Sequence, residues 1–126
     1  MKIFNTYLII AAACCLTLTL SNTMIGQKKL RHVVAFSYKP DVTEAQKAKI
    51  ITAFQALKKE IPEIIEFEGG ADIHPEGKKF AQCFIVTVKD EKDLGIYGNH
   101  PKHKAFQAIV DPLLAEVTVV DYWTEK

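Results

Sequence analysis

The strongest constraint on this chain is the order in which two periodicities of apolar residues follow one another along it. Four segments have the two-residue alternation, or the β-branched and aromatic composition, of strands: residues 30–38, 64–71, 80–88 and 117–123. Between the first two, apolar residues recur at helical spacing on one face: Ile50, Phe54, Leu57 and Ile61. A second helical region separates the last two strands.

Helix signals agree with this order. Thr43, with Gln46 three residues later, forms a capping box that predicts the start of the first helix, and Pro62 marks its end. Residues 90–97 predict a short helical turn. The main second helix then begins at Pro101, because proline is favoured in the first helical turn, where its missing N–H costs nothing.

The resulting order βαββαβ predicts an α+β domain with a four-stranded antiparallel sheet and both helices on one face, the ferredoxin-like arrangement. The segment 80–88 is the most strongly strand-forming and should be central. Because three strands carry apolar residues on both faces, we expect a second copy to cover the bare face, giving a homodimeric α/β-barrel. A monomer with a partly apolar sheet is the alternative.

Residues 1–26 have the composition of a secretory leader. Lys2 is the only charged residue in this segment, and the residues from Tyr7 to Leu20 are mostly apolar. This stretch of about 14 residues is shorter than the roughly 20 that a membrane-spanning helix needs, so we expect cleavage after Gly26. The mature protein would then be a single domain, residues 27–126, in the periplasm or outside the cell.

Two alternatives would keep the protein at a membrane. One is an uncleaved leader that acts as an anchor. The other is a lipoprotein, because Cys14 and Cys15 follow three alanines and are candidates for lipidation. Once the leader is removed, Cys83 is the only cysteine, so no intrachain disulfide can form, and its place in the third strand predicts a small buried apolar residue.

The charge pattern argues against a nucleic-acid partner. The chain has 16 Lys and Arg against 15 Asp and Glu, and the two signs are interspersed. Phosphate binding needs concentrated positive charge, which this distribution does not provide. We therefore expect a solvated surface of mixed charge.

Three titratable residues are predicted to meet inside the domain. His103 lies on the apolar stripe of the second helix with Phe106 and Val110, so it should point at the sheet. His32 lies on the strand face that carries the large residues, and Tyr97 comes just before the helix. We predict catalytic roles for His103, Tyr97 and His32, and ligand contacts for Val34, Phe36, His100 and Phe106.

Structural roles for the same residues are the alternative. A histidine on an apolar face more often satisfies buried polar groups, and His100, directly before Pro101, has the position of a helix start. His100 and His103 have a spacing that metal ligands use, but Pro101 lies between them and no carboxylate is aimed the same way, so we expect no metal. No Gly-rich phosphate loop is present, and no cofactor is expected. His74 is expected to be a solvated loop residue.

The chain resembles the stress-responsive A/B-barrel domain family over residues 31–123. The resemblance is carried by His32 to Phe36, Lys39 to Val42, Tyr97 to His103, Phe106, Pro112 and Val119 to Tyr122. It implies a homodimeric α+β barrel with a ligand cavity in each subunit. A plant polyketide cyclase in this family uses the second histidine of the HPxH motif as a base, assisted by the tyrosine before the motif. The resemblance thus implies these roles for His103 and Tyr97, with His32 in the same cavity.

Three functional interpretations follow. The first is a cofactor-free pocket protein that binds a small apolar carbonyl or phenolic compound and catalyses proton transfer, as a cyclase or lyase does. The second is a non-catalytic dimeric stress-response or structural module. The third is a cofactor-free monooxygenase, because oxygenases share this scaffold and fold alone does not decide chemistry. An enclosed apolar cavity with His103 and Tyr97 on its wall favours the first over the second.

Overall fold

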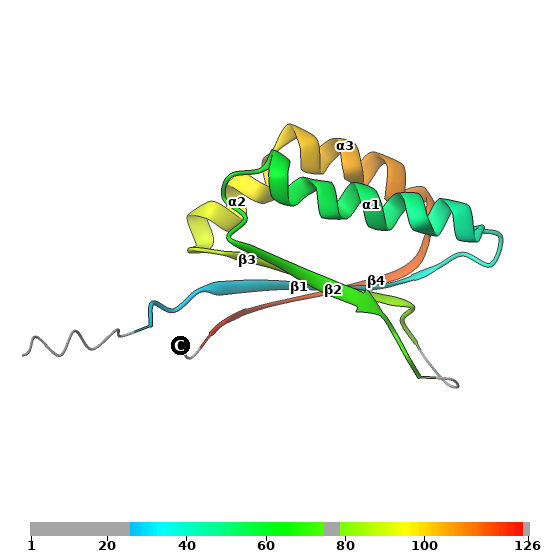
Figure 1. Cartoon of the computed structure of the whole chain (residues 1–126), viewed down its shortest axis with the longest axis horizontal. Helices are drawn as coiled ribbons and strands as arrows, with labels where there is room; N and C mark the ends of the chain where they lie inside the picture. Colours follow the sequence, from blue (N-terminus) through cyan, green and yellow to red (C-terminus); the bar gives the residue numbers. More distant parts are fainter. Residues whose placement is uncertain (1–25, 75–78, 125–126) are drawn as a thin grey trace, which may run out of the picture.

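The computed structural model describes residues 26–74 and 79–124 (Figure 1). The elements are β1 (Leu30–Tyr38), α1 (Glu44–Glu60), β2 (Glu66–Ala71), β3 (Gln82–Val88), α2 (Glu91–Asn99), α3 (Pro101–Val110), the 3-10 turn η1 (Asp111–Leu113) and β4 (Leu114–Trp123). The strands form one antiparallel sheet in the order β2-β3-β1-β4, and the helices lie on one of its faces (Figure 1). The predicted α+β ferredoxin-like fold is therefore confirmed. Residues 1–25 of the predicted leader lie outside the described residues.

The elements differ from the sequence expectation mainly at their ends. β4 begins at Leu114, three residues before the predicted strand, because a register shift between Ser37 and Tyr38 lets Tyr38 pair with Leu114. The expected helical turn at residues 90–97 is a helix that continues to Asn99. Asp90 caps this helix by accepting a hydrogen bond from the N–H of Asp93 at 3.0 Å.

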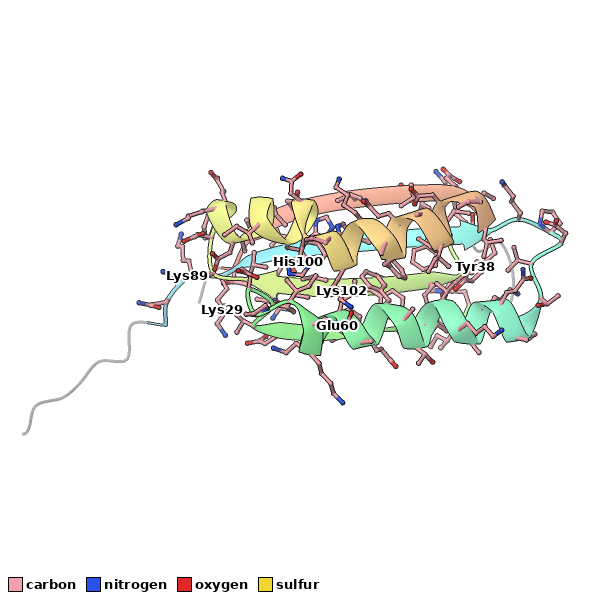
Figure 2. All side chains as sticks on the ribbon, turned by 90° about the horizontal axis from the view of Figure 1, so that it is seen from above. Lys29, Tyr38, Glu60, Lys89, His100 and Lys102 are labelled. Atoms are coloured by element: carbon pink, nitrogen blue, oxygen red, sulfur yellow. The ribbon has the colours of Figure 1, made fainter. Side chains whose placement is uncertain are left out.

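Helix α1 has both the capping box and the buried apolar face that the sequence predicts. The capping box of Thr43 and Gln46 is present, with both reciprocal hydrogen bonds. Its predicted apolar face is buried against the sheet: Ile50, Phe54 and Leu57. At its other end, Glu60 forms an ion pair with Lys102 of α3 at 3.4 Å, so the two helices lie side by side (Figure 2).

Aromatic rings fill the space between α1, α3 and the central strands. The ring centroid of Phe54 lies 4.5 Å from that of Phe84 and 4.7 Å from that of Phe106, and Phe36 lies 6.0 Å from Phe84. Phe36 and Phe84 share the helix-facing side because β1 and β3 alternate sides at every residue. Rings at these separations add favourable quadrupole contacts to the burial of their area. This cluster is the centre of the core.

Strand β4 is left largely uncovered, because the helices stop short of this edge of the sheet (Figure 2). On its helix-facing side, Val117 is 53% exposed and Val119 is 49% exposed. On its other side, Val120 is 53% exposed and Tyr122 is 45% exposed. An edge strand that exposes apolar residues on both faces is unusual for an isolated domain and marks a contact surface.

The sheet face away from the helices carries a short apolar row. Val33 of β1 pairs with Ile85 of β3 on one side and with Val120 of β4 on the other. Cys83 lies on this face too, beside Ala35, and is half-buried. Cys83 was predicted to be a small buried residue, and it is more exposed than expected because alternation along β3 turns it away from the helices. None of the helices in residues 26–74 and 79–124 is long and apolar enough to cross a membrane.

The pairing of β2 with β3 depends on glycine at position 69. Gly69 lies opposite Phe84, and a Cβ at this position would lie 2.4 Å from the Cys83 carbonyl oxygen and 2.8 Å from the Phe84 Cα atom. Backbone atoms cannot move aside as the tip of a side chain can. A Cβ at Gly70 would meet no atom within 4 Å.

We therefore expect Gly69→Ala to lower the free energy of unfolding by about 1 to 3 kcal/mol, because overpacking forces the backbone to shift. Gly70→Ala is the matched control and should change it by less than about 0.5 kcal/mol. Urea unfolding of both variants measures the difference. Equal stability of the two variants would contradict the close contact at Gly69.

Candidate functional site

A cavity of about 560 Å³ lies between the sheet and helices α2 and α3. Its apolar wall comes from every layer of the domain: Val34, Phe36, Phe54, Leu94, Phe106, Val110, Leu114, Val117 and Val119. Its polar wall includes His32, Tyr97 and His103. A mostly apolar cavity of this size with a few converging polar groups has the features of a small-molecule site.

The structure brings the three predicted catalytic residues together from three different elements. The ring of Tyr97, in α2, stacks on that of His103, in α3, with centroids 4.3 Å apart and planes at 29°. The ring of His32, in β1, meets that of Tyr97 edge-on at 5.7 Å and 64°. The three side chains therefore form one cluster on the cavity wall. Their chemical roles stay predictions.

The break between α2 and α3 produces this meeting. His100 has an extended backbone (φ −62°, ψ 135°), because the residue before a proline is disfavoured in the helical region, and the chain restarts as α3 at Pro101. The His100 side chain caps the new helix, with Nδ1 accepting a hydrogen bond from the Lys102 N–H at 3.2 Å.

Three of the four predicted ligand contacts line the cavity and one does not. Val34, Phe36 and Phe106 are on the wall. His100 is absent from it, because its ring is occupied at the helix start. The cap, which the sequence analysis left as the alternative for His100, accounts for its position.

His103 is held in one tautomer. Its Nδ1 lies 3.2 Å from the carbonyl oxygen of Gly98, and a carbonyl can only accept, so Nδ1 carries the proton. The neutral ring then has its free lone pair on Nε2. Burial lowers the pKa of His103, and the Gly98 hydrogen bond offsets only part of this shift. The imidazole is therefore neutral at physiological pH.

His32 has a carboxylate partner that the sequence analysis did not name as a site residue. Its Nδ1 donates to Oδ1 of Asp121 at 2.7 Å, since the two residues pair directly across β1 and β4. Asp121 lines the cavity. The available signal was its position two residues after Val119, on the helix-facing side of a strand where a carboxylate is otherwise unexpected.

Tyr97 is the most deeply buried polar member of the cluster. Its residue is 1% exposed, and burial raises the pKa of its phenol, which therefore stays protonated. Within the described part of the chain, the hydroxyl has no hydrogen-bond partner. A buried donor without a partner costs free energy, so a group that reached this hydroxyl would gain an uncontested hydrogen bond.

The structure gives no support for a metal centre. In residues 26–74 and 79–124, no group of three or more histidine, cysteine or carboxylate side chains is placed to hold an ion. His74, expected to be a solvated loop residue, is exposed and its Nδ1 lies 2.8 Å from Oδ1 of Asp72.

Fold and site together define the class of protein: a ferredoxin-like α+β domain with an apolar cavity that carries two histidines and a tyrosine. The chain belongs to the family described as the stress responsive A/B barrel domain, whose model matches residues 30–124. The predicted family assignment is therefore confirmed.

Similar proteins include enzymes and proteins without a known activity. Olivetolic acid cyclase of Cannabis sativa is 25% identical over 99 residues, which is 77% of this chain and 98% of the cyclase. A dimeric ferredoxin-like protein of unknown function from Thermobifida fusca is 28% identical, with a TM-score of 0.71, over 82% of this chain and 97% of its own. Hydroxynitrile lyase from Passiflora edulis superposes with a TM-score of 0.74 at 22% identity, over 79% of this chain and 96% of the lyase, and shows the shared fold.

The lowered pKa of His103 makes a prediction about stability. A histidine whose pKa is lower in the folded than in the unfolded state binds its proton more readily after unfolding. Its contribution to stability is therefore fully present when the pH is above the pKa of the unfolded state, and it is lost as the pH falls through the pKa of the folded state. When the pH falls from about 7 to about 5, we expect the free energy of unfolding to decrease more for the wild-type protein than for the His103→Gln variant. Urea unfolding as a function of pH measures this, and parallel curves would contradict it.

Proposed function

We propose that this protein is a cofactor-free pocket protein that binds a small apolar carbonyl or phenolic compound and catalyses proton transfer on it. The observation that carries the proposal is the joint position of His103 and Tyr97 on the wall of an apolar cavity. Olivetolic acid cyclase, a member of the same family, supports an enzymatic role for the fold. The reaction would be of the cyclase or lyase kind.

In the proposed reaction, His103 is the base. Its Nδ1–H is engaged by the Gly98 carbonyl, which leaves the Nε2 lone pair free, and burial keeps the ring neutral by lowering its pKa. A neutral imidazole beside a ligand carbonyl can take a proton from the adjacent carbon.

Tyr97 supplies the matching acid. Burial raises its pKa, so the phenol remains a donor. A hydroxyl that has no partner among the described residues can donate to the oxygen that gains negative charge as the proton leaves. His32, held by Asp121, presents its Nε2 as a further acceptor that orients the ligand.

A non-catalytic module is the second candidate, and one observation favours it. The His103–Gly98 hydrogen bond ties the start of α3 to the end of α2, which is a structural role in itself. In that case the imidazole would stabilise the helix junction and the cavity would serve no reaction.

The deciding experiment is the exchange of the α-protons of 2-tetralone, an apolar ketone whose ring is fused to benzene, for deuterium in D₂O, followed by NMR. We expect the protein to accelerate exchange, and His103→Ala to reduce the enhancement by about a hundredfold to ten-thousandfold, the usual contribution of a general base. Tyr97→Phe should reduce it less while keeping the ring. No acceleration by the wild-type protein, together with a lower melting temperature for His103→Ala, would support the non-catalytic module instead.

His100→Ala is the matched control for this experiment. It removes an imidazole three residues away that does not line the cavity. It should lower stability by about 1 kcal/mol through loss of the helix cap and leave the exchange rate unchanged. A rate loss as large as that of His103→Ala would mean that the helix junction, rather than the base, controls the reaction.

We also propose that the protein is a homodimer. The support is the apolar row of Val33, Ile85 and Val120 on the sheet face away from the helices, together with the dimeric state of the Thermobifida fusca relative.

Light scattering on residues 27–126 is expected to give the mass of a dimer at micromolar concentration. Val33→Lys should shift the mass to that of a monomer, because an unpaired charge in an interface core is costly. Lys49→Ala, on the exposed side of α1, is a control that should leave the dimer intact. A monomeric wild-type protein would remove the barrel from the proposal.

The proposal includes export, which rests on the basic start and apolar stretch of residues 1–26. The location would be the periplasm or the outside of the cell. A lipid on Cys14 or Cys15 is the alternative that would retain the protein at a membrane. Intact mass of the exported form distinguishes cleavage after Gly26 from lipidation.

A further inference from the structure

We infer that the cavity selects neutral or cationic ligands and rejects small organic anions. This inference rests on the proposed ligand-binding function and adds the charge class of the ligand. It starts from the charges on the cavity wall, which among residues 26–74 and 79–124 includes three carboxylates, those of Asp111, Glu116 and Asp121, and no lysine or arginine.

The carboxylates stand at both ends of the cavity. Asp121 pairs with His32 at the end that holds the histidine and tyrosine cluster. Asp111 follows directly after α3, at the end near Val110 and Leu114. Burial lowers the pKa of His103, and Asp111 is the last of several smaller influences, acting to raise it.

The partners of these carboxylates leave net negative charge. Glu116 pairs with Lys79 at 2.8 Å and so contributes little. Asp121 is hydrogen-bonded to His32 and has no lysine or arginine partner among the described residues. Asp111 has no ion-pair partner among the described residues. Lys104 also acts on His103, but it is exposed and does not line the cavity.

The cavity is small enough that any bound ligand lies close to the negatively charged carboxylates of its wall. From Asp121 to Val117 the wall formed by β4 spans roughly 13 Å at about 3.3 Å per residue, so at low ionic strength a ligand beside this wall lies within one Debye length, about 30 Å at 0.01 M, of Asp121. The apolar walls lower the local dielectric constant and strengthen the field.

A second, independent observation points to a ligand here. Tyr97 lines the cavity, is 1% exposed, and has a hydroxyl without a partner in the described part of the chain. Because its phenol stays protonated, it offers a neutral donor and not a positive charge. An anionic ligand would gain one hydrogen bond at Tyr97 and meet two carboxylates. A neutral carbonyl compound would gain the same bond without the repulsion.

The test uses three naphthalene probes of nearly equal size: 2-naphthamide, which is neutral, 2-naphthoate, an anion, and 2-naphthylmethylamine, a cation at pH 7. Calorimetric titration of the full-length chain at low ionic strength should show naphthoate binding at least about tenfold more weakly than the amide, and the amine at least as tightly as the amide. In Asp111→Asn/Asp121→Asn, the ratio of the naphthoate dissociation constant to the amide dissociation constant should fall to about threefold or less, whatever common change in affinity the altered His32 contact causes.

Glu44→Gln is the matched control, because this carboxylate is 88% exposed on α1 and does not line the cavity. It should leave all three affinities unchanged. Naphthoate binding as tightly as the amide, or a gap that persists in the double variant, would overturn the charge inference and leave the proposed function standing. If none of the probes binds and 2-tetralone exchange is not accelerated either, both are overturned.

Discussion

The pairing of β1 with a neighbour on each side is the constraint on which the rest of the domain depends. β1 is hydrogen-bonded to β3 along one edge and to β4 along the other, so its alternation cannot slip. A shift of one residue would turn His32, Val34 and Phe36 away from the helices and bring Val33 and Ala35 in. The same register therefore sets the core, the cavity wall and the apolar row on the opposite face.

The second constraint is the interrupted helix. A continuous helix through residues 91–110 would keep Tyr97 and His103 six residues apart on one axis, about 9 Å along it, too far for their rings to stack. The extended backbone at His100 and the proline after it turn the chain, and the two rings meet at 4.3 Å. One local steric rule, the restriction on a residue before proline, thus assembles the candidate catalytic pair.

Sequence reasoning reached the fold and most of the site because both rest on short-range patterns. The capping box, the helical stripe and the strand alternation placed Phe54, Phe106 and His103 on the correct faces. It missed the role of Asp121, because a cross-strand partner depends on register between residues far apart in the sequence. The burial of Cys83 was overestimated, because alternation along the third strand shows that the strand has two sides but does not show which of them the helices cover.

The exposed edge strand explains why this core contains a cavity. α1 packs over β2 and β3 with a cluster of phenylalanine rings, of which Phe54 also forms part of the cavity wall. α2 and α3 lie toward β1, and β4 extends beyond them. The side chains of Val117 and Val119 therefore form a part of the cavity wall that no helix covers. Filling that space would require larger residues than valine on β4. Small β-branched residues at an uncovered edge, with a carboxylate among them, give up packing energy that the domain would otherwise gain. The proposed ligand accounts for this arrangement, because a bound apolar compound would contact the same valines and restore the packing energy that the empty cavity lacks.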